Sequence, residues 1–245
     1  MRRDGFARKC YDDSPFQLLE NALRTPGRFI TFEGLDGCGK STQLALASEH
    51  LRRLGYSVTA TREPGGTPVG QQIRDVVVNA SPGSVSPLTE LALMFAARAQ
   101  HIEQVILPAL QRGEVVVCDR FVDSTVAYQG CGHGVSLETI QALDGLLCQG
   151  ARPDLTLLLD VDAQTSLRRT AARNREARQQ ESRFEKEGMA FFERVRKGYH
   201  EIARQEPGRV KIVDAGGSIA EVQEAVRRII EEFLGKEKRE SAHGV

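Results

Sequence analysis

The sequence predicts an α/β fold in which five parallel strands form one sheet with helices on both faces. Two unbroken apolar runs, residues 114–119 and 155–161, have the composition of strands buried on both sides. Three further β-rich runs lie at 28–33, 56–61 and 209–214. Stretches between them carry apolar residues three and four positions apart, which is the spacing of one helix face. Alternation of strands and helices is typical of a doubly wound parallel sheet.

The composition is that of a globular protein. The chain has 245 residues, a formal net charge of zero and 40% hydrophobic residues, a balance that disordered chains lack. No apolar run approaches the ~20 residues that span a bilayer, and no apolar segment follows the basic start. We therefore expect no membrane partner and no secretory signal. Zero net charge disfavours a general nucleic-acid coat protein, so we expect no nucleic-acid partner.

The five cysteines indicate a reducing compartment. Their count is odd and no CxxC pair is present, so the sequence predicts neither a disulfide framework nor a zinc site. Reduced thiols favour a cytoplasmic protein. The cysteines are Cys10, Cys38, Cys118, Cys131 and Cys148.

The chain opens with a polar extension, residues 1–27, to which the sequence assigns no chemistry. A short helix over 14–23 is predicted within it, because Pro15 follows a Ser cap. After the strand at 28–33 comes a glycine loop and then a helix. Its apolar face carries Leu44, Ala47, Leu51 and Leu54.

A long helix is predicted over 86–110. Ser86 caps it, Pro87 occupies the first position, and Pro108 should kink or end it. Ser218 and Glu221 form a capping box for a last helix, which a polar tail follows. Because no repeat or low-complexity linker interrupts the pattern, we expect one domain over 28–245.

The loop after the first strand matches the pattern G-x4-GK[ST]. Glycines let backbone N–H groups turn around a phosphate, Lys40 can reach the outer phosphates, and the Ser41 hydroxyl can ligate Mg²⁺. A chance glycine turn is the alternative, which the preceding strand and following helix disfavour. The sequence therefore predicts a P-loop NTPase fold that binds ATP or GTP with Mg²⁺. The nucleotide-binding residues predicted are Gly34, Leu35, Asp36, Gly37, Cys38, Gly39, Lys40, Ser41 and Thr42.

Cys38 lies within that loop. A thiol at a helix N-terminus tends to a lowered pKa, so we expect Cys38 to be sensitive to oxidation and protected by bound ATP. The alternative is that the thiol is buried and unreactive.

Other features narrow the class of P-loop protein. A GTPase switch should carry an NKxD motif, and none is present. The DxxG string at 214–217 follows the last strand and is interpreted as a turn. A small P-loop protein with a second anion site fits a kinase of a small phosphorylated substrate.

A second anion site is predicted from two arginines. Arg62 follows the second strand and Arg120 the third, so both lie at the sheet edge that carries the P-loop. They can bind an acceptor phosphate with bidentate donors. Asp119 ends an apolar strand where a magnesium-organising carboxylate is expected. Each arginine alone could equally be a surface charge.

Six strings of residues together resemble the bacterial thymidylate kinase family over about 28–233. They read GLDGCGKST (34–42), TREPGGT (61–67), LMFAARAQ (93–100), DRF and STVAYQG (within 119–130), RPDLTLLLDV (152–161) and RFE (183–185). The resemblance implies phosphorylation of dTMP to dTDP with ATP and Mg²⁺, for dTTP synthesis. It also implies a homodimer.

The resemblance further implies an acceptor pocket. Phe95 would stack on the thymine ring and Arg98 would bond its carbonyl edge, although core packing is the alternative for Phe95. Asp36 would lie near the sugar 3′-hydroxyl, or merely stabilise its own turn. A cis Glu63–Pro64 bond would aim Arg62 at the phosphate. The dTMP-binding residues implied are Asp36, Arg62, Phe95, Arg98, Arg120, Ser124, Thr125, Tyr128 and Gln129.

A basic segment at about 168–190 resembles the family's helical lid. Some relatives carry a catalytic arginine at the position of Gly37, and its absence here moves that role to the lid. Arg183 is the first choice, and a solvated helical face is the alternative for the arginines as a set. The catalytic residues predicted are Lys40, Asp119, Arg120 and Arg183, and the metal ligands are Ser41 and Asp119.

Two other functions remain compatible with these residues. One is a kinase for another nucleotide, such as dUMP. The other is a P-loop regulatory protein that holds ATP without an acceptor, which the arginines disfavour. In the kinase reading no general base is needed, because the attacking phosphate is already anionic near neutral pH.

Overall fold

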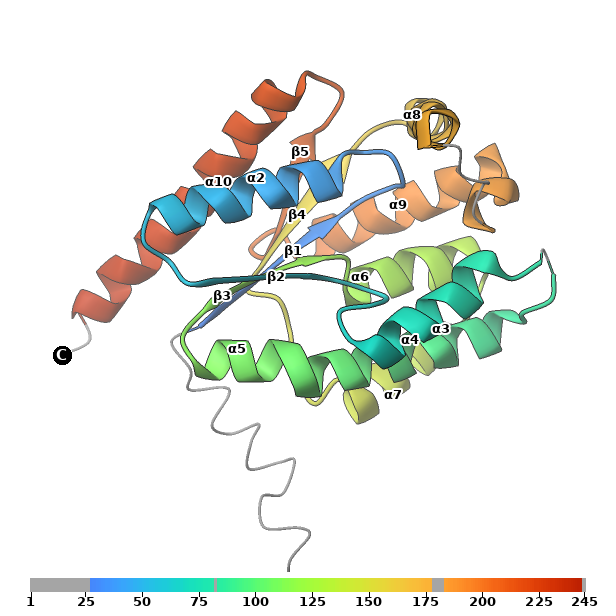
Figure 1. Ribbon diagram of the computed structural model, residues 1–245, viewed down its shortest axis with the longest axis horizontal. Coiled ribbons are helices and arrows are strands. Elements are labelled where there is room, and N and C mark those ends of the chain that lie inside the picture. The colour runs from blue at the N-terminus through green and yellow to red at the C-terminus, as the bar shows by residue number, and fades with distance from the viewer. Residues whose placement is uncertain (1–26, 82, 178–182, 244–245) are drawn as a thin grey trace, which may run out of the picture.

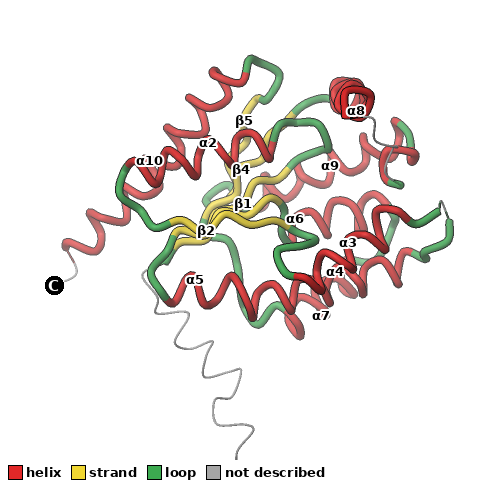
Figure 2. The backbone as a smooth tube through the Cα atoms, viewed as in Figure 1, coloured by secondary structure: helices red, strands yellow, loops and turns green. Residues whose placement is uncertain are grey.

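The computed structural model describes residues 27–81, 83–177 and 183–243. Its centre is a sheet of five parallel strands in the order β2-β3-β1-β4-β5, with helices to either side (Figures 1 and 2). The strands are β1 Arg28–Glu33, β2 Val58–Arg62, β3 Val115–Asp119, β4 Leu155–Asp160 and β5 Val210–Asp214. The predicted parallel sheet is confirmed, because every strand overlaps the run of residues that indicated it.

Helices cover both faces of the sheet (Figure 1). α2 (Lys40–Arg53) and α10 (Ile219–His243) pack on one face, against side chains such as Ile30 and Phe32 of β1. The opposite face packs Phe29 and Val116 against α4, α5 and α7. The helices there are α3 Pro68–Asn79, α4 Pro87–His101, α5 Leu107–Gln111, α6 Val122–Thr125, α7 Leu137–Leu147 and α9 Met189–Gln205, and α8 Ala163–Ala177 stands above the carboxyl edge.

The helix predicted over 86–110 is divided. Ser86 caps α4 as expected, accepting from the N–H of Thr89. The chain then forms a π-helical turn, η1 (Ile102–Ile106), before α5, which holds Pro108 in its first turn. A proline lacks the N–H and crowds the carbonyl four residues earlier, so a wider turn ahead of Pro108 accommodates it. A second π-helical segment, η2 (Val126–Gly132), follows α6.

Of the two helices predicted near the ends of the chain, only the C-terminal one can be compared with the structure. The short helix predicted at 14–23 lies outside the described residues. The predicted capping box at Ser218 and Glu221 is present, and α10 continues through the polar tail to His243. No helix in the described part of the chain is both long and apolar enough to cross a membrane.

The strand register brings the site together. Arg62 and Phe32 both pair with Asp119, so β1, β2 and β3 end side by side. The loops that follow these three strands therefore meet at one edge of the sheet.

Candidate active site

The loop between β1 and α2 turns through glycines in the left-handed region. Gly34, Gly37 and Gly39 have φ values of 134°, 75° and 100°. A Cβ on Gly34 would lie 2.4 Å from the carbonyl oxygen of Leu159, so a larger residue does not fit there. α2 begins at Lys40 directly after the loop, and its first N–H groups have no partner within the helix. This is the arrangement that a phosphate-binding loop requires.

Lys40 and Ser41 open α2 and face the end of β3. The buried Lys40 ammonium donates to the carbonyl oxygens of Gly34 at 3.1 Å and Leu35 at 2.8 Å. Ser41 Oγ donates to Asp119 Oδ2 at 2.7 Å across the mouth of the loop.

This pair of oxygen groups fits a magnesium ion. Mg²⁺ prefers oxygen ligands and is usually held by one or two carboxylates together with waters and substrate phosphates. Within the described residues, no group of three or more His, Cys, Asp or Glu side chains could hold an ion by itself. Ser41 and Asp119 therefore suit an ion whose coordination a bound polyphosphate completes.

A cavity of about 840 Å³ joins the loop to the ends of β2 and β3. It is lined by Asp36, Gly37, Gly39, Lys40, Ser41, Thr42, Arg62, Arg98, Asp119, Arg120, Ser124, Thr125, Tyr128, Gln129 and Arg183 among the predicted residues. Gly34, Leu35, Cys38 and Phe95 do not line it. Most of the predicted donor and acceptor residues therefore meet in one space.

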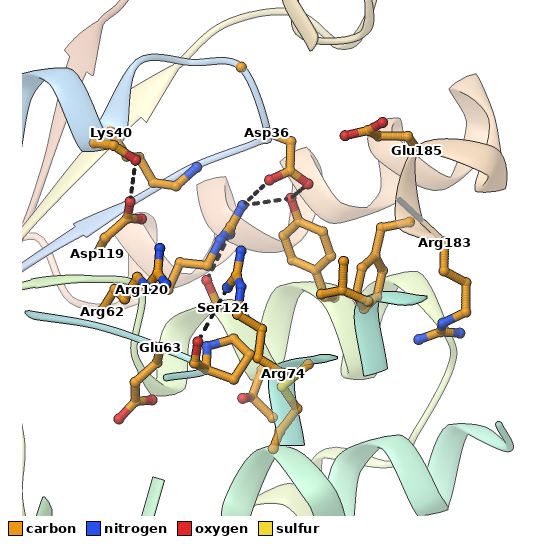
Figure 3. A pocket seen from close by; sticks show the side chains of 18 of the residues that line it. Asp36, Lys40, Arg62, Glu63, Arg74, Asp119, Arg120, Ser124, Arg183 and Glu185 are labelled. Atoms are coloured by element: carbon orange, nitrogen blue, oxygen red, sulfur yellow. Dashed lines mark hydrogen bonds and ion pairs between the residues drawn. The ribbon is translucent and has the colours of Figure 1, made fainter. Parts of the chain in front are cut away.

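Arg120 is the most connected cation of the cavity. It follows β3 with a φ of 74°, a left-handed conformation rare for a side chain of this size, and this turns the side chain back over the sheet edge. Its terminal nitrogens donate to Asp36 and Ser124 at 2.8 and 3.0 Å (Figure 3), and to Tyr128 and Tyr199 at 3.2 and 3.1 Å. The guanidinium also lies 4.8 Å from the centre of the Tyr128 ring. Arg120 is therefore held rigidly before any ligand arrives.

Asp36 is ionised in this setting. Burial alone would raise the pKa of its carboxyl, but Arg120 and Lys40 outweigh burial and lower the pKa to about 2. Tyr128 donates its hydroxyl to the same carboxylate at 3.2 Å. Asp36 thus bridges the P-loop and the acceptor side.

Arg98 projects from α4 and is buried. Its Nε donates to Glu63 Oε2 at 2.7 Å and its Nη2 to Thr125 Oγ1 at 2.9 Å. Its remaining nitrogen, Nη1, is buried without a hydrogen-bond partner among the described residues. Glu63 also bonds His101, which reaches Thr61. The sequence reading missed the roles of Glu63 and His101, because this network forms only when β2 and α4 pack together.

Phe95 lies away from the cavity, whereas the resemblance implies that it contacts the thymine ring. Phe95 is fully buried in the core on the α4 side of the sheet and does not line the cavity. Met94 lines it instead, together with Arg98. Residues 94 and 98 are one helical turn apart and share a face, whereas residue 95 is rotated by about 100° toward the core.

Two more arginines line the cavity near the end of β2. Arg62 is exposed and donates to Gln71 Oε1 at 2.9 Å, and the Glu63–Pro64 peptide beside it is cis, as the resemblance implies. Arg74 of α3 donates to the carbonyl oxygen of Pro64 at 3.2 Å (Figure 3). Burial and the neighbouring arginines lower the pKa of Arg74. Arg74 was missed because α3 gave no sequence signal that it faces the site.

Arg183 lines the cavity, as the prediction of a lid arginine requires, but its side chain is bonded to α3 and α4. It is buried and forms an ion pair with Glu90 of α4, and its Nε donates to the carbonyl oxygen of Val77 at 3.2 Å. Its guanidinium lies far from Lys40 and turns away from it (Figure 3). Arg173 of α8 is the exposed lid arginine on the cavity wall, and Arg178 lies outside the described residues. The placement of Arg183 indicates anchoring of the lid segment.

The structure favours the unreactive alternative for Cys38. The thiol is buried in the core between α2 and the sheet. Burial raises the pKa of Cys38 and outweighs the effect of the nearby Lys40 ammonium. A neutral buried thiol is a poor nucleophile.

The fold and the cavity together define a P-loop phosphotransferase with an arginine-rich acceptor pocket. The family model described as thymidylate kinase matches residues 32–226. The chain belongs to the thymidylate kinase family, and its fold is a P-loop NTPase fold.

Individual relatives are similar to this chain along most of their length. The thymidylate kinase of Pelobacter propionicus is 49% identical over 201 residues, covering 82% of this chain and 92% of that protein. That of Pseudomonas syringae pv. tomato is 49% identical over 208 residues, covering 85% and 97%. The crystal structure of thymidylate kinase from Ehrlichia chaffeensis superposes with a TM-score of 0.68 at 34% identity, covering 84% and 98%.

Proposed function

We propose that this enzyme transfers the γ-phosphate of ATP to dTMP, giving dTDP and ADP. One observation carries the proposal: a phosphate-binding loop and a group of hydrogen-bonded arginines open into the same cavity. Membership of the thymidylate kinase family supports the choice of nucleotide.

On the donor side, the loop from Gly34 to Thr42 binds the ATP phosphates. Its N–H groups and the Lys40 ammonium neutralise their charge. Ser41 and Asp119 hold the magnesium ion. That ion, when bound, neutralises and orients the transferring phosphate.

On the acceptor side, three arginines receive the phosphate of dTMP. Arg62, Arg74 and Arg120 all line the cavity near the ends of β2 and β3. Tyr128 packs beside the sugar and Asp36 faces its 3′-hydroxyl. Ser124, like Tyr128, accepts a bond from Arg120.

The base occupies the inner end of the same pocket. Met94, in place of Phe95, contacts the ring face. Arg98 donates from its unpartnered Nη1 to the 4-carbonyl, and Thr125 and Gln129 complete the wall.

The reaction needs positioning and charge neutralisation more than proton transfer. The acceptor phosphate is an anion near neutral pH and attacks in line, so no base is required. Arg173 of the lid supplies positive charge from the open side of the cavity. Arg183 assists by holding the lid segment on α4 through Glu90.

One assay tests the function. The chain is given ATP and Mg²⁺ with dTMP, dUMP, dCMP, dGMP or no acceptor, and ADP release is measured. We expect release that depends on dTMP. ATP hydrolysis at the same rate without any acceptor would overturn the proposal in favour of a simple ATPase.

We also propose a cytoplasmic homodimer. The four cysteines within the described residues are free thiols, as expected in a reducing compartment. Val69 and Val76 of α3 and Leu146 of α7 are exposed apolar side chains on two helices that both pack against α4, and they are available for a second copy. Light scattering on the full chain tests this: a dimer is expected, and Val76→Asp should weaken it.

A further inference from the structure

The Glu90 carboxylate lies against three polar side chains at once. It lies in the first turn of α4 and is fully buried. It accepts a hydrogen bond from Gln129 Nε2 at 2.6 Å and pairs with the guanidinium of Arg183. The Nδ1 atom of His133 lies 3.2 Å from its Oε1. Burial would raise the pKa of Glu90, but His133, Gln129 and Arg183 together lower it, so the group is a carboxylate.

This carboxylate determines how the Gln129 amide is turned. An ionised carboxylate can only accept hydrogen bonds, so Gln129 must offer it the NH₂ group. The amide oxygen Oε1 is then the atom left for a ligand. Gln129 lines the cavity, where Arg98 holds its unpartnered donor Nη1. The pocket thus presents one fixed acceptor and one fixed donor.

This pair of groups matches one kind of pyrimidine. Thymine and uracil carry a ring N–H beside the 4-carbonyl, which are a donor and an acceptor. Cytosine carries the reverse pair, an unprotonated ring nitrogen beside an amino group. A site whose buried polar groups are fixed in one sense leaves them unpaired against the reverse pattern, and it discriminates strongly for that reason.

We propose that Glu90 is a positioning residue for base selection, which locks the Gln129 amide in the orientation that accepts a pyrimidine ring N–H and excludes cytosine. This rests on the proposed function, in which a pyrimidine monophosphate is the acceptor. Arg183 contributes indirectly, because its positive charge keeps Glu90 ionised. Arg183 lies in the segment that returns from the lid, so base selection and lid placement share one carboxylate.

The test compares dTMP with dCMP in matched variants. Glu90→Gln keeps the shape but can donate as well as accept, so the Gln129 amide is free to reverse. We expect the ratio of kcat/KM for dTMP to that for dCMP to fall about tenfold or more, the worth of one hydrogen bond in this setting. Glu90→Asp, which still only accepts, should largely preserve the ratio. Glu187→Gln alters the exposed neighbour of His133 and should leave the ratio unchanged.

A double variant separates positioning from general support of the fold. Gln129→Leu removes the amide and should itself lower the ratio; in that background, Glu90→Gln should lower it no further. The ratio is measured on one preparation, so partial unfolding cancels. If dTMP turnover is present but Glu90→Gln slows both nucleotides equally, or if Gln129→Leu keeps the ratio, this inference fails. If the native chain does not phosphorylate dTMP, the proposed function fails instead.

Discussion

The two walls of the cavity are built in opposite ways. On the acceptor wall, Arg98 and Arg120 are held by hydrogen bonds to neighbouring side chains, with little or no exposure to solvent. On the donor and lid wall, Ser41 and Thr42 are exposed, and Arg173 makes one 3.3 Å contact with Glu185 while 57% exposed. Selection of the acceptor is therefore built into the fold, whereas the donor side is completed by the ligand.

The difference predicts where substitutions act. The buried side chains of either wall support the fold as well as the site, so their loss should cost stability. The exposed side chains, which are most frequent on the donor and lid wall, should affect rate with little effect on stability.

The largest expected effect is on stability, for Arg183→Met. Arg183 and Glu90 are a buried pair, 4% and 0% exposed. Removal of one partner leaves the charge of the other buried without its counter-ion. We expect a loss of about 4 kcal/mol in the free energy of unfolding, or about 10 °C in Tm. Denaturant and thermal unfolding measure it. Arg204→Met is the matched control, since Arg204 pairs with Glu201 at 72% exposure.

A different result for Arg183→Met would support the catalytic role that the sequence predicts for Arg183. A variant of native stability in which kcat alone falls would place the guanidinium on the transferring phosphate, with the lid in another position. The sequence favoured that catalytic role, and the pair with Glu90, 93 residues distant, was invisible to it.

The second prediction concerns Glu33, beneath Arg120. Glu33 accepts from Ser124 and Tyr199, and burial with the nearby Asp123 raises its pKa to about 7 from 4.5. Folding therefore takes up a proton between these values. The stabilising contribution is full below about pH 4.5 and is lost as pH rises through 7, amounting to about 3 kcal/mol at most.

Glu33→Gln removes this titration. Subtracting its pH profile of unfolding free energy from that of the native chain should leave a curve that falls from pH 4.5 to 7. A flat difference would mean that Glu33 is ionised throughout, and that the acceptor wall is less sealed from water than its burial indicates.

The fold was predictable from sequence because its signals are local. Unbroken apolar runs mark strands such as 114–119, and the glycine string after β1 marks the P-loop. For the site, the sequence predicted which helix or strand carries a functional residue, but not which side chain of that element faces the cavity. α4 is apolar on most sides near Met94 and Phe95, so a single residue step decides which side chain faces the cavity. That rotation is set by packing against β1 and α7, which no local pattern records.

The third prediction moves to the donor wall. Asp119→Asn keeps the contact with Ser41 possible but removes a charge that a magnesium ion needs. We expect kcat/KM for MgATP to fall about a hundredfold, equivalent to ~2.7 kcal/mol, and half-maximal activity to require more Mg²⁺. The free energy of unfolding should change by about 1 kcal/mol or less, because Asp119 is only half-buried and asparagine can keep the contact with Ser41. An unaltered Mg²⁺ requirement would remove Asp119 from the ion site.

The smallest expected effect is that of Arg173→Met on the lid. Several positively charged side chains line this open part of the cavity. The loss of one exposed guanidinium should therefore lower kcat about tenfold, equivalent to ~1.4 kcal/mol. KM for dTMP should not change, and stability should shift by less than ~0.5 kcal/mol, because the Arg173 side chain is itself 57% exposed. Arg175→Met is the matched control, two residues along α8 and off the cavity wall. Equal rates for both variants would show that charge on the lid acts collectively, whereas a loss of stability at Arg173 would mean that the lid wall is built like the acceptor wall.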